Sequence, residues 1–132
     1  MAPKKENKKQ NDIDFEIQFI EGVLKEKPDF IEALVALGDL YTKRGFFEKG
    51  LEIDKQLARL RPSDPTILYN LSCSYSLVNN VDKSLEAMKL AIGYGYSDYG
   101  YLENDSDLDN LRQDSRFQQF FVTIKNVTPR KS

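Results

Sequence analysis

The sequence predicts an all-α fold, a short right-handed solenoid of stacked antiparallel helix pairs. Apolar residues recur at helical spacing along most of the 132 residues, and the same pattern returns after 34 residues. Proline, glycine, aspartate and asparagine separate these apolar runs, as expected at helix ends. A period of this length accommodates two helices of about 14 residues each, together with their turns.

The repeat is visible as pairs of identical residues 34 positions apart. The pairs are Pro28 and Pro62, Leu34 and Leu68, Leu37 and Leu71, Tyr41 and Tyr75, and Leu51 and Leu85. One helix pair cannot bury its apolar face alone, so such repeats stack on one another. We therefore expect two successive repeats, over residues 29–62 and 64–95.

A leading amphipathic helix is expected over residues 13–27, because its apolar residues fall on one helical face. These residues are Ile13, Ile17, Ile20 and Leu24. The helix should end before Pro28, since proline disfavours a helical conformation in the residue before it. It stands in the position of the second helix of a pair whose first helix is missing.

Polar residues and glycine predict the helix ends of the first repeat. Asp29, followed three residues later by Glu32, has the spacing of a capping box and predicts the start of its first helix. Gly45 predicts the end of that helix, where a left-handed backbone conformation is favoured. The second helix is then expected over residues 47–61.

Similar residues predict the helix ends of the second repeat. Asp64 is expected to cap a helix over residues 67–78, with Pro65 at the first helical position. After a turn of two asparagines, Asp82 is expected to cap a further helix over residues 84–92.

These residues resemble the tetratricopeptide repeat (TPR) pattern W-x2-L-G-x2-Y…A-x3-F…P. The matching runs are Leu34-x-x-Leu37-Gly38-x-x-Tyr41 with Pro62, and Leu68-x-x-Leu71-Ser72-x-x-Tyr75 with Ser84-x3-Met88. Leucine replaces the tryptophan in both units, and Ser72 replaces the glycine. Gly50 and Asp54 stand where the second helix usually has alanine and an aromatic residue. The resemblance covers residues 15–95 and implies a scaffold rather than a reaction.

Residues 97–124 resemble the closing segment of certain small bacterial TPR proteins. The matching residues are Leu102, Asp105, Asp107, Leu108, Leu111, Arg112, Asp114, Arg116 and Phe117. A stack of helix pairs leaves an apolar face at its last repeat, which this segment is expected to cover. Its aspartates are expected to cap very short helices.

The composition points away from enzymes of the usual kinds. The chain has no histidine, which is the commonest general base and metal ligand, and its one cysteine, Cys73, cannot form an internal disulfide. No phosphate-binding loop or nucleophile motif is present, so we expect no catalytic residue, cofactor or metal. Without a signal peptide or an apolar membrane segment, the protein is expected to be cytoplasmic.

Charge is unevenly distributed along the chain. Residues 1–11 and 125–132 each carry a net charge of +3, which leaves −8 for residues 12–124 out of a total of −2. The two basic ends are expected to be disordered tails flanking one domain. The acidic body favours basic or apolar partners over nucleic acid or membranes.

Three features invite a chemical interpretation that the sequence does not favour. Asp105, Asp107 and Asp109 have the alternation of a calcium loop, yet asparagine and Arg116 occupy its glycine and glutamate positions, so helix capping is favoured. Cys73 has no basic neighbour to activate it and is interpreted as a packing residue. The tyrosines of residues 94–101 lack interleaved lysine or arginine and are interpreted likewise.

The first helix of each repeat is expected to line a concave groove. The groove residues predicted from helical spacing are Glu32, Val35, Ala36, Asp39, Lys43, Thr66, Tyr69, Asn70, Cys73 and Leu77. In some TPR domains, a lysine–asparagine clamp here binds a chaperone's C-terminal carboxylate, but only Asn70 fits that clamp. Asp39 would repel the carboxylate, so a basic or apolar peptide suits this groove better.

The leading functional hypothesis is a non-enzymatic adaptor that binds a protein segment in the concave groove, with Tyr69 as its aromatic anchor. One alternative is a self-associating scaffold, in which helix faces mediate homo-oligomers. A weaker alternative is a nucleic-acid accessory protein that acts through its lysine-rich tails.

Overall fold

The computed structural model describes residues 5–127 of the chain, with side chains from residue 8 onward. The helices are α1 (Lys5–Glu26), α2 (Ile31–Arg44), α3 (Phe47–Leu60), α4 (Pro65–Leu77), α5 (Val81–Gly93), α6 (Tyr99–Asn104), α7 (Asp109–Arg112) and α8 (Ser115–Val127). A 3-10 turn, η1 (Ser106–Leu108), lies between α6 and α7. This part of the chain contains no strand, so the predicted all-α class is confirmed.

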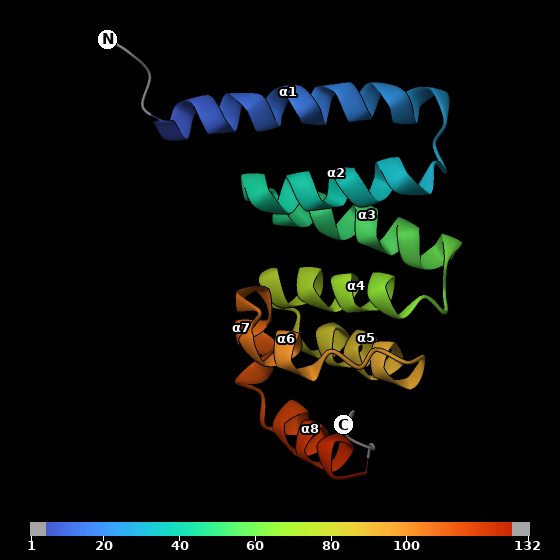
Figure 1. Ribbon diagram of the computed structural model, residues 1–132, viewed down its shortest axis with the longest axis vertical. Coiled ribbons are helices and arrows are strands. Elements are labelled where there is room, and N and C mark those ends of the chain that lie inside the picture. Colours follow the sequence, from blue (N-terminus) through green and yellow to red (C-terminus); the bar gives the residue numbers. More distant parts are fainter. Residues whose placement is uncertain (1–4, 128–132) are drawn as a thin grey trace.

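The helices stack as a short solenoid in which consecutive helices are neighbours. Helix α1 lies at one end and packs on α2, and the pairs α2–α3 and α4–α5 follow in order (Figure 1). The short elements α6, η1 and α7 lie beside α4 and α5, and α8 forms the other end (Figure 1). No helix in the described residues is both long and apolar enough to cross a membrane.

Two of the predicted helix ends are confirmed in atomic detail. Gly45 follows α2 with a backbone φ of 85°, and its N–H donates to Thr42 O. The Asp64 carboxylate accepts hydrogen bonds from the N–H groups of Thr66 (2.9 Å) and Ile67 (3.1 Å), directly before Pro65. A left-handed glycine and a carboxylate cap satisfy backbone groups that the helix itself leaves unpaired.

Two predicted caps are wrong. Helix α2 begins after Phe30, and no side chain caps it, so Asp29 does not act as its cap. The Phe30 N–H closes the preceding turn by donating to Lys27 O at 3.2 Å. Helix α5 is capped by Asn80, which accepts from the Lys83 N–H at 3.2 Å. Asp82 lies instead in the first turn of α5 and accepts a hydrogen bond from Arg116 Nη2 at 2.7 Å.

The expectation of a disordered tail over residues 1–11 differs from the structure, in which residues 5–11 belong to α1. Lysine, glutamate and glutamine are good helix formers, and this run contains neither glycine nor proline, so the helix continues toward the N-terminus. At the other end, residues 125–127 belong to α8. The rest of both predicted tails lies outside the described residues.

Small residues let the helices of each pair approach closely. A Cβ placed on Gly38 would lie 3.2 Å from Asp54 Oδ1, and one placed on Gly50 would lie 3.2 Å from Thr42 Oγ1. One period later the same two positions are Ser72 and Ser84, both fully buried. The hydroxyl of each serine donates a hydrogen bond to the backbone carbonyl of the other at 2.8 Å. Helices α4 and α5 are therefore joined by two reciprocal hydrogen bonds at the point where α2 and α3 have only two glycines.

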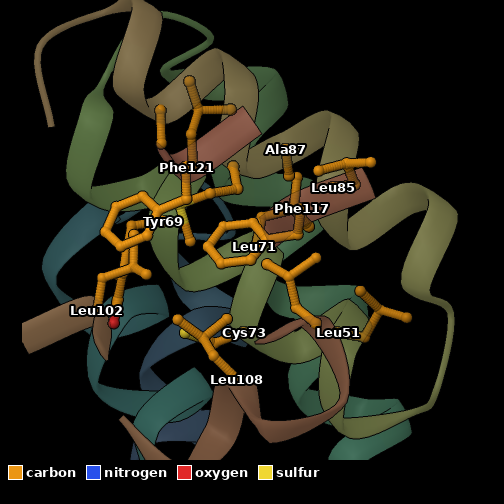
Figure 2. Packing of buried hydrophobic residues seen from close by; sticks show 14 residues of the cluster. Leu51, Tyr69, Leu71, Cys73, Leu85, Ala87, Leu102, Leu108, Phe117 and Phe121 are labelled. Carbon is orange, nitrogen blue, oxygen red and sulfur yellow. The ribbon is translucent and has the colours of Figure 1, made fainter. Parts of the chain in front are cut away.

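The closing segment buries its apolar side chains against the second repeat. Leu102, Leu108 and Leu111 are fully buried, and Phe117 and Phe121 join them in one cluster with residues of α4 and α5 (Figure 2). Aspartates cap the short elements: Asp98 precedes α6, Asp105 precedes η1 and Asp114 precedes α8. The segment therefore covers the apolar face that the second repeat would otherwise expose.

Replacing Phe117 by alanine is expected to lower the free energy of unfolding by about 3–4 kcal/mol, because its ring is 2% exposed and leaves a cavity. Val122→Ala on the same helix is the control, since that side chain is 57% exposed and should change stability by less than about 0.5 kcal/mol. Urea unfolding followed by circular dichroism measures both. If Phe117→Ala lowered the free energy of unfolding as little as Val122→Ala does, a structural role for the closing segment would be contradicted.

Candidate functional site

A cleft of about 350 Å³ lies between α2, α3, α4 and the closing segment. The lining residues are Val35, Ala36, Gly38, Asp39, Thr42, Asp54, Leu57, Tyr69, Asn70, Cys73, Ser74, Leu77, Tyr101, Asp105 and Asp107. We call this site the acidic cleft. Its volume falls within the range of roughly 300–1,000 Å³ that is typical of ligand-binding pockets.

Seven of the ten predicted groove residues line the acidic cleft: Val35, Ala36, Asp39, Tyr69, Asn70, Cys73 and Leu77. The other three, Glu32, Lys43 and Thr66, are exposed and do not line it. Glu32 and Thr66 lie in the first turns of α2 and α4, and Lys43 lies in the last turn of α2. The cleft is therefore confined to the middle of the predicted stripe.

Four carboxylates converge on the cleft from three parts of the chain. Asp39 comes from α2, Asp54 from α3, and Asp105 and Asp107 from the closing segment. Within the part of the chain that the structure describes, no lysine or arginine lines the cleft. Lys43 pairs with Asp39 at 2.9 Å, but both side chains are about 60% exposed, so water and salt screen this pair.

Asp54 is the most deeply placed of the four carboxylates. Its side chain is 8% exposed, and the Ser74 hydroxyl on α4 donates a hydrogen bond to Oδ2. Burial raises the pKa of Asp54 to about 6, and the hydrogen bond from Ser74 opposes that rise. The carboxylate reaches the cleft past Gly38, where a larger side chain would stand in its way.

Tyr69 does not offer the exposed ring that the sequence predicts. Its side chain is 4% exposed, its ring stacks on Tyr96 with centroids 4.3 Å apart, and its hydroxyl donates to Asp105 Oδ2 at 2.7 Å. Burial, before all other causes, raises the pKa of Tyr69 above its ordinary value. Figure 2 shows the ring among the core residues, near Leu102. Tyr69 borders the cleft and positions Asp105, rather than serving as an anchor.

Asp105 is the centre of the hydrogen bonds at this end of the cleft. Besides the Tyr69 hydroxyl, its carboxylate accepts from the Asp107 N–H at 3.0 Å and from Cys73 Sγ at 3.7 Å. Burial raises the pKa of the Cys73 thiol, which keeps the thiol protonated and unreactive. The pKa of Asp107 is raised by burial and by the neighbouring Asp105 and Asp109.

The alternating aspartates of the closing segment, which have the spacing of a calcium loop, are engaged by other groups of the protein. Among the described residues, no group of three or more histidine, cysteine, aspartate or glutamate side chains is arranged to hold an ion. Asp105 caps η1, and the carboxylate of Asp109 pairs with Arg112, so the aspartates have partners within the protein. Of the three aspartates interpreted as helix caps, Asp105 acts as one, whereas Asp109 forms an ion pair and Asp107 lines the cleft.

The accessible aromatic side chain at the cleft is Tyr101, which is 58% exposed. Val35 is 42% exposed and contributes an apolar surface from α2, and Asn70 contributes an exposed amide from α4. Together they give the cleft one aromatic, one apolar and one hydrogen-bonding group beside its carboxylates. Such a mixture is typical of surfaces that bind peptides.

Sequence reasoning missed Asp54, Tyr101, Asp105 and Asp107 as members of the site. A signal existed for Asp54, because a carboxylate at a position that usually holds an aromatic residue needs an explanation. For Asp105 and Asp107, the capping interpretation was incomplete, because the same carboxylates also face the cleft. Their proximity to α4 depends on how the closing segment folds back.

Asp54→Asn is expected to remove a pH dependence of stability. Between about pH 4 and pH 6 the folded protein keeps a proton on Asp54 that the unfolded chain releases, so rising pH lowers the stability of the wild type. The stability of the variant relative to wild type should therefore increase by about 2 kcal/mol from pH 4 to pH 7.5. Urea unfolding at both pH values measures this difference, and a constant difference would contradict a raised pKa at Asp54.

No family model matches the chain. A chloroplastic protein from Arabidopsis thaliana is 31% identical in an alignment of 80 residues that covers 58% of this chain and 24% of that protein. The chain thus spans about a quarter of the length of this curated relative.

Solved structures of MamA resemble the whole stack. MamA 41-end from Desulfovibrio magneticus RS-1 has a TM-score of 0.67 at 17% identity, covering 91% of this chain and 70% of that one. Another MamA crystal structure has a TM-score of 0.68 at 22% identity, covering 95% of this chain and 74% of that one. MamA is a TPR-like helical solenoid, and at these identities the similarity concerns the fold alone. The chain therefore has a tetratricopeptide-repeat-like fold, as the sequence predicts.

Proposed function

We propose that the protein is a non-enzymatic interaction module that binds a basic peptide segment of a partner protein in the acidic cleft. One observation carries the proposal: four carboxylates line one concave site, and no cationic side chain of the described residues lines it with them. A site with one sign of charge attracts ligands of the opposite sign and repels like charges. The TPR-like fold supports a role in protein interaction without naming a partner.

The geometry suggests how such a segment is held. Asp39 is exposed and Asp107 is half-buried, so both can attract a lysine or arginine as it approaches the cleft. Asp54 lies deeper, where burial strengthens an ion pair, because the surroundings screen charge less than water does. Tyr101 packs on the aliphatic part of the cationic side chain, and the Asn70 amide bonds to the peptide backbone.

An adaptor role in the cytoplasm fits this proposal. The single cysteine is free and buried, and burial raises the pKa of its thiol, which keeps the thiol protonated. The proposed activity is therefore binding, with specificity set by charge and by the size of the cleft.

Asp39→Lys is expected to weaken binding of a short fluorescein-labelled lysine-rich peptide by roughly threefold to tenfold, because it places a like charge at the edge of the cleft. Fluorescence anisotropy measures the dissociation constant. An equally long glutamate-rich peptide should not bind the wild type. If it binds as well as the basic peptide, charge does not select the ligand.

Glu86→Lys is the matched control for this experiment. Like Asp39, Glu86 is an exposed carboxylate paired with a lysine on its own helix, but it lies on α5 and does not line the cleft. Both substitutions change the net charge equally. Equal losses of affinity would show that the peptide senses only the overall charge, and would contradict binding in the cleft.

Binding of the basic peptide is expected to strengthen as the pH rises from 5 to 7.5. The pKa of Asp54 is about 6, so over this range its carboxyl loses a proton and gains the charge that a cation pairs with. We expect an increase in affinity of roughly threefold to tenfold. The increase should be much smaller in Asp54→Asn, and an equal increase in both proteins would contradict a role for Asp54.

A further inference from the structure

The outer face of α1 is an apolar surface at the end of the stack. Phe15 and Phe19 are 71% and 66% exposed, although Ile17 between them is 6% exposed and packs toward α2. In Figure 1, α2 and all the elements that follow it lie on one side of α1. The two rings, with Glu16 and Ile20, border a shallow apolar hollow. An exposed patch of this kind marks an interaction surface.

The residues along this outer face follow the spacing of a coiled-coil seam. They are Lys8, Asp12, Phe15, Phe19, Gly22 and Glu26, separated alternately by four and three residues. This alternation keeps side chains in line along one face of a helix that packs against another helix. The face is open at Gly22, where no heavy atom lies within 4 Å of the place that a Cβ would occupy.

The residues of this seam form complementary pairs at equal distances on either side of residue 17. If the helix is turned end to end, Phe15 meets Phe19, and Lys8 meets Glu26. In the same register, the glycine of one copy faces the Asp12 side chain of the other and leaves room for it. The seam is therefore complementary to itself when two copies run in opposite directions.

We propose that two copies of this chain pair through the outer faces of their α1 helices, antiparallel and centred on residue 17. The pairing buries Phe15 and Phe19 of both copies in one cluster and forms two Lys8–Glu26 ion pairs. An isologous contact of this kind closes on itself and makes a dimer rather than a filament. It uses a surface separate from the acidic cleft, so each copy keeps its cleft open.

The dimer is expected to be weak and concentration-dependent. Four phenylalanine side chains that are already about one-third covered bury on the order of 500 Å² when they pack together. The rings alone bury less than the roughly 1,000 Å² expected of a stable interface, so even with the flanking helix surface this contact belongs to the weak, transient class. Mass as a function of protein concentration therefore provides the test.

Analytical ultracentrifugation of the full chain should show a monomer–dimer equilibrium. Phe15→Ala with Phe19→Ala should raise the dimer dissociation constant at least roughly thirtyfold, because both rings of each copy are lost from the contact. Tyr94→Ala with Val122→Ala is the matched control, since these side chains are 52% and 57% exposed elsewhere, and it should leave the constant unchanged. A wild type that stays monomeric at millimolar concentration would overturn the proposal and indicate another occupant for this face.

A charge exchange tests the antiparallel register. Lys8→Glu alone places two glutamates opposite each other and should weaken the dimer about twofold to fivefold, and Glu26→Lys alone should do the same with two lysines. The double variant K8E/E26K restores opposite charges and should recover the wild-type constant. Both changes suit the helix dipole, so α1 should remain folded. The proposal would be overturned if the double variant did not recover the wild-type dissociation constant. It would also be overturned if Phe15→Ala with Phe19→Ala left that constant unchanged.

Discussion

Close approach within each helix pair is the constraint on which the rest of the structure depends. In the first pair, glycines at positions 38 and 50 remove the side chains that would hold α2 and α3 apart. In the second pair, Ser72 and Ser84 occupy the same two positions of the repeat and exchange hydrogen bonds with each other's backbone. Two different chemistries satisfy one geometric requirement, because packing needs small residues at these points rather than particular ones.

The acidic cleft follows from this packing. With no side chain at residue 38, the carboxylate of Asp54 reaches from α3 past α2, and Ser74 on α4 donates a hydrogen bond to it. A buried carboxylate is costly, and its raised pKa expresses that cost. A larger apolar residue at position 54 would fill the site as ordinary core. The aspartate instead gives the cleft a buried carboxyl group.

The closing segment has two roles that are physically linked. Its leucines and phenylalanines cover the second repeat, and this packing brings Asp105 and Asp107 to the edge of the cleft. The hydrogen bond from Tyr69 to Asp105 joins the two roles, since it ties α4 to the start of η1. Because the closing segment packs over it, Tyr69 is buried. The exposed aromatic ring at the cleft belongs to Tyr101 on α6.

The sequence by itself determined the local structure and the repeat. Periodic apolar residues, Gly45 and the Asp64–Pro65 start act within one or two helical turns, so they specify helices and most of their ends. Only the tertiary structure decided which residues form the cleft, because the closing segment meets α4 from far along the chain, as in the bond from Tyr69 to Asp105, 36 positions away. It also decided that Tyr69 is buried. Helical spacing places a residue on a face, whereas its exposure depends on what the rest of the chain packs against that face.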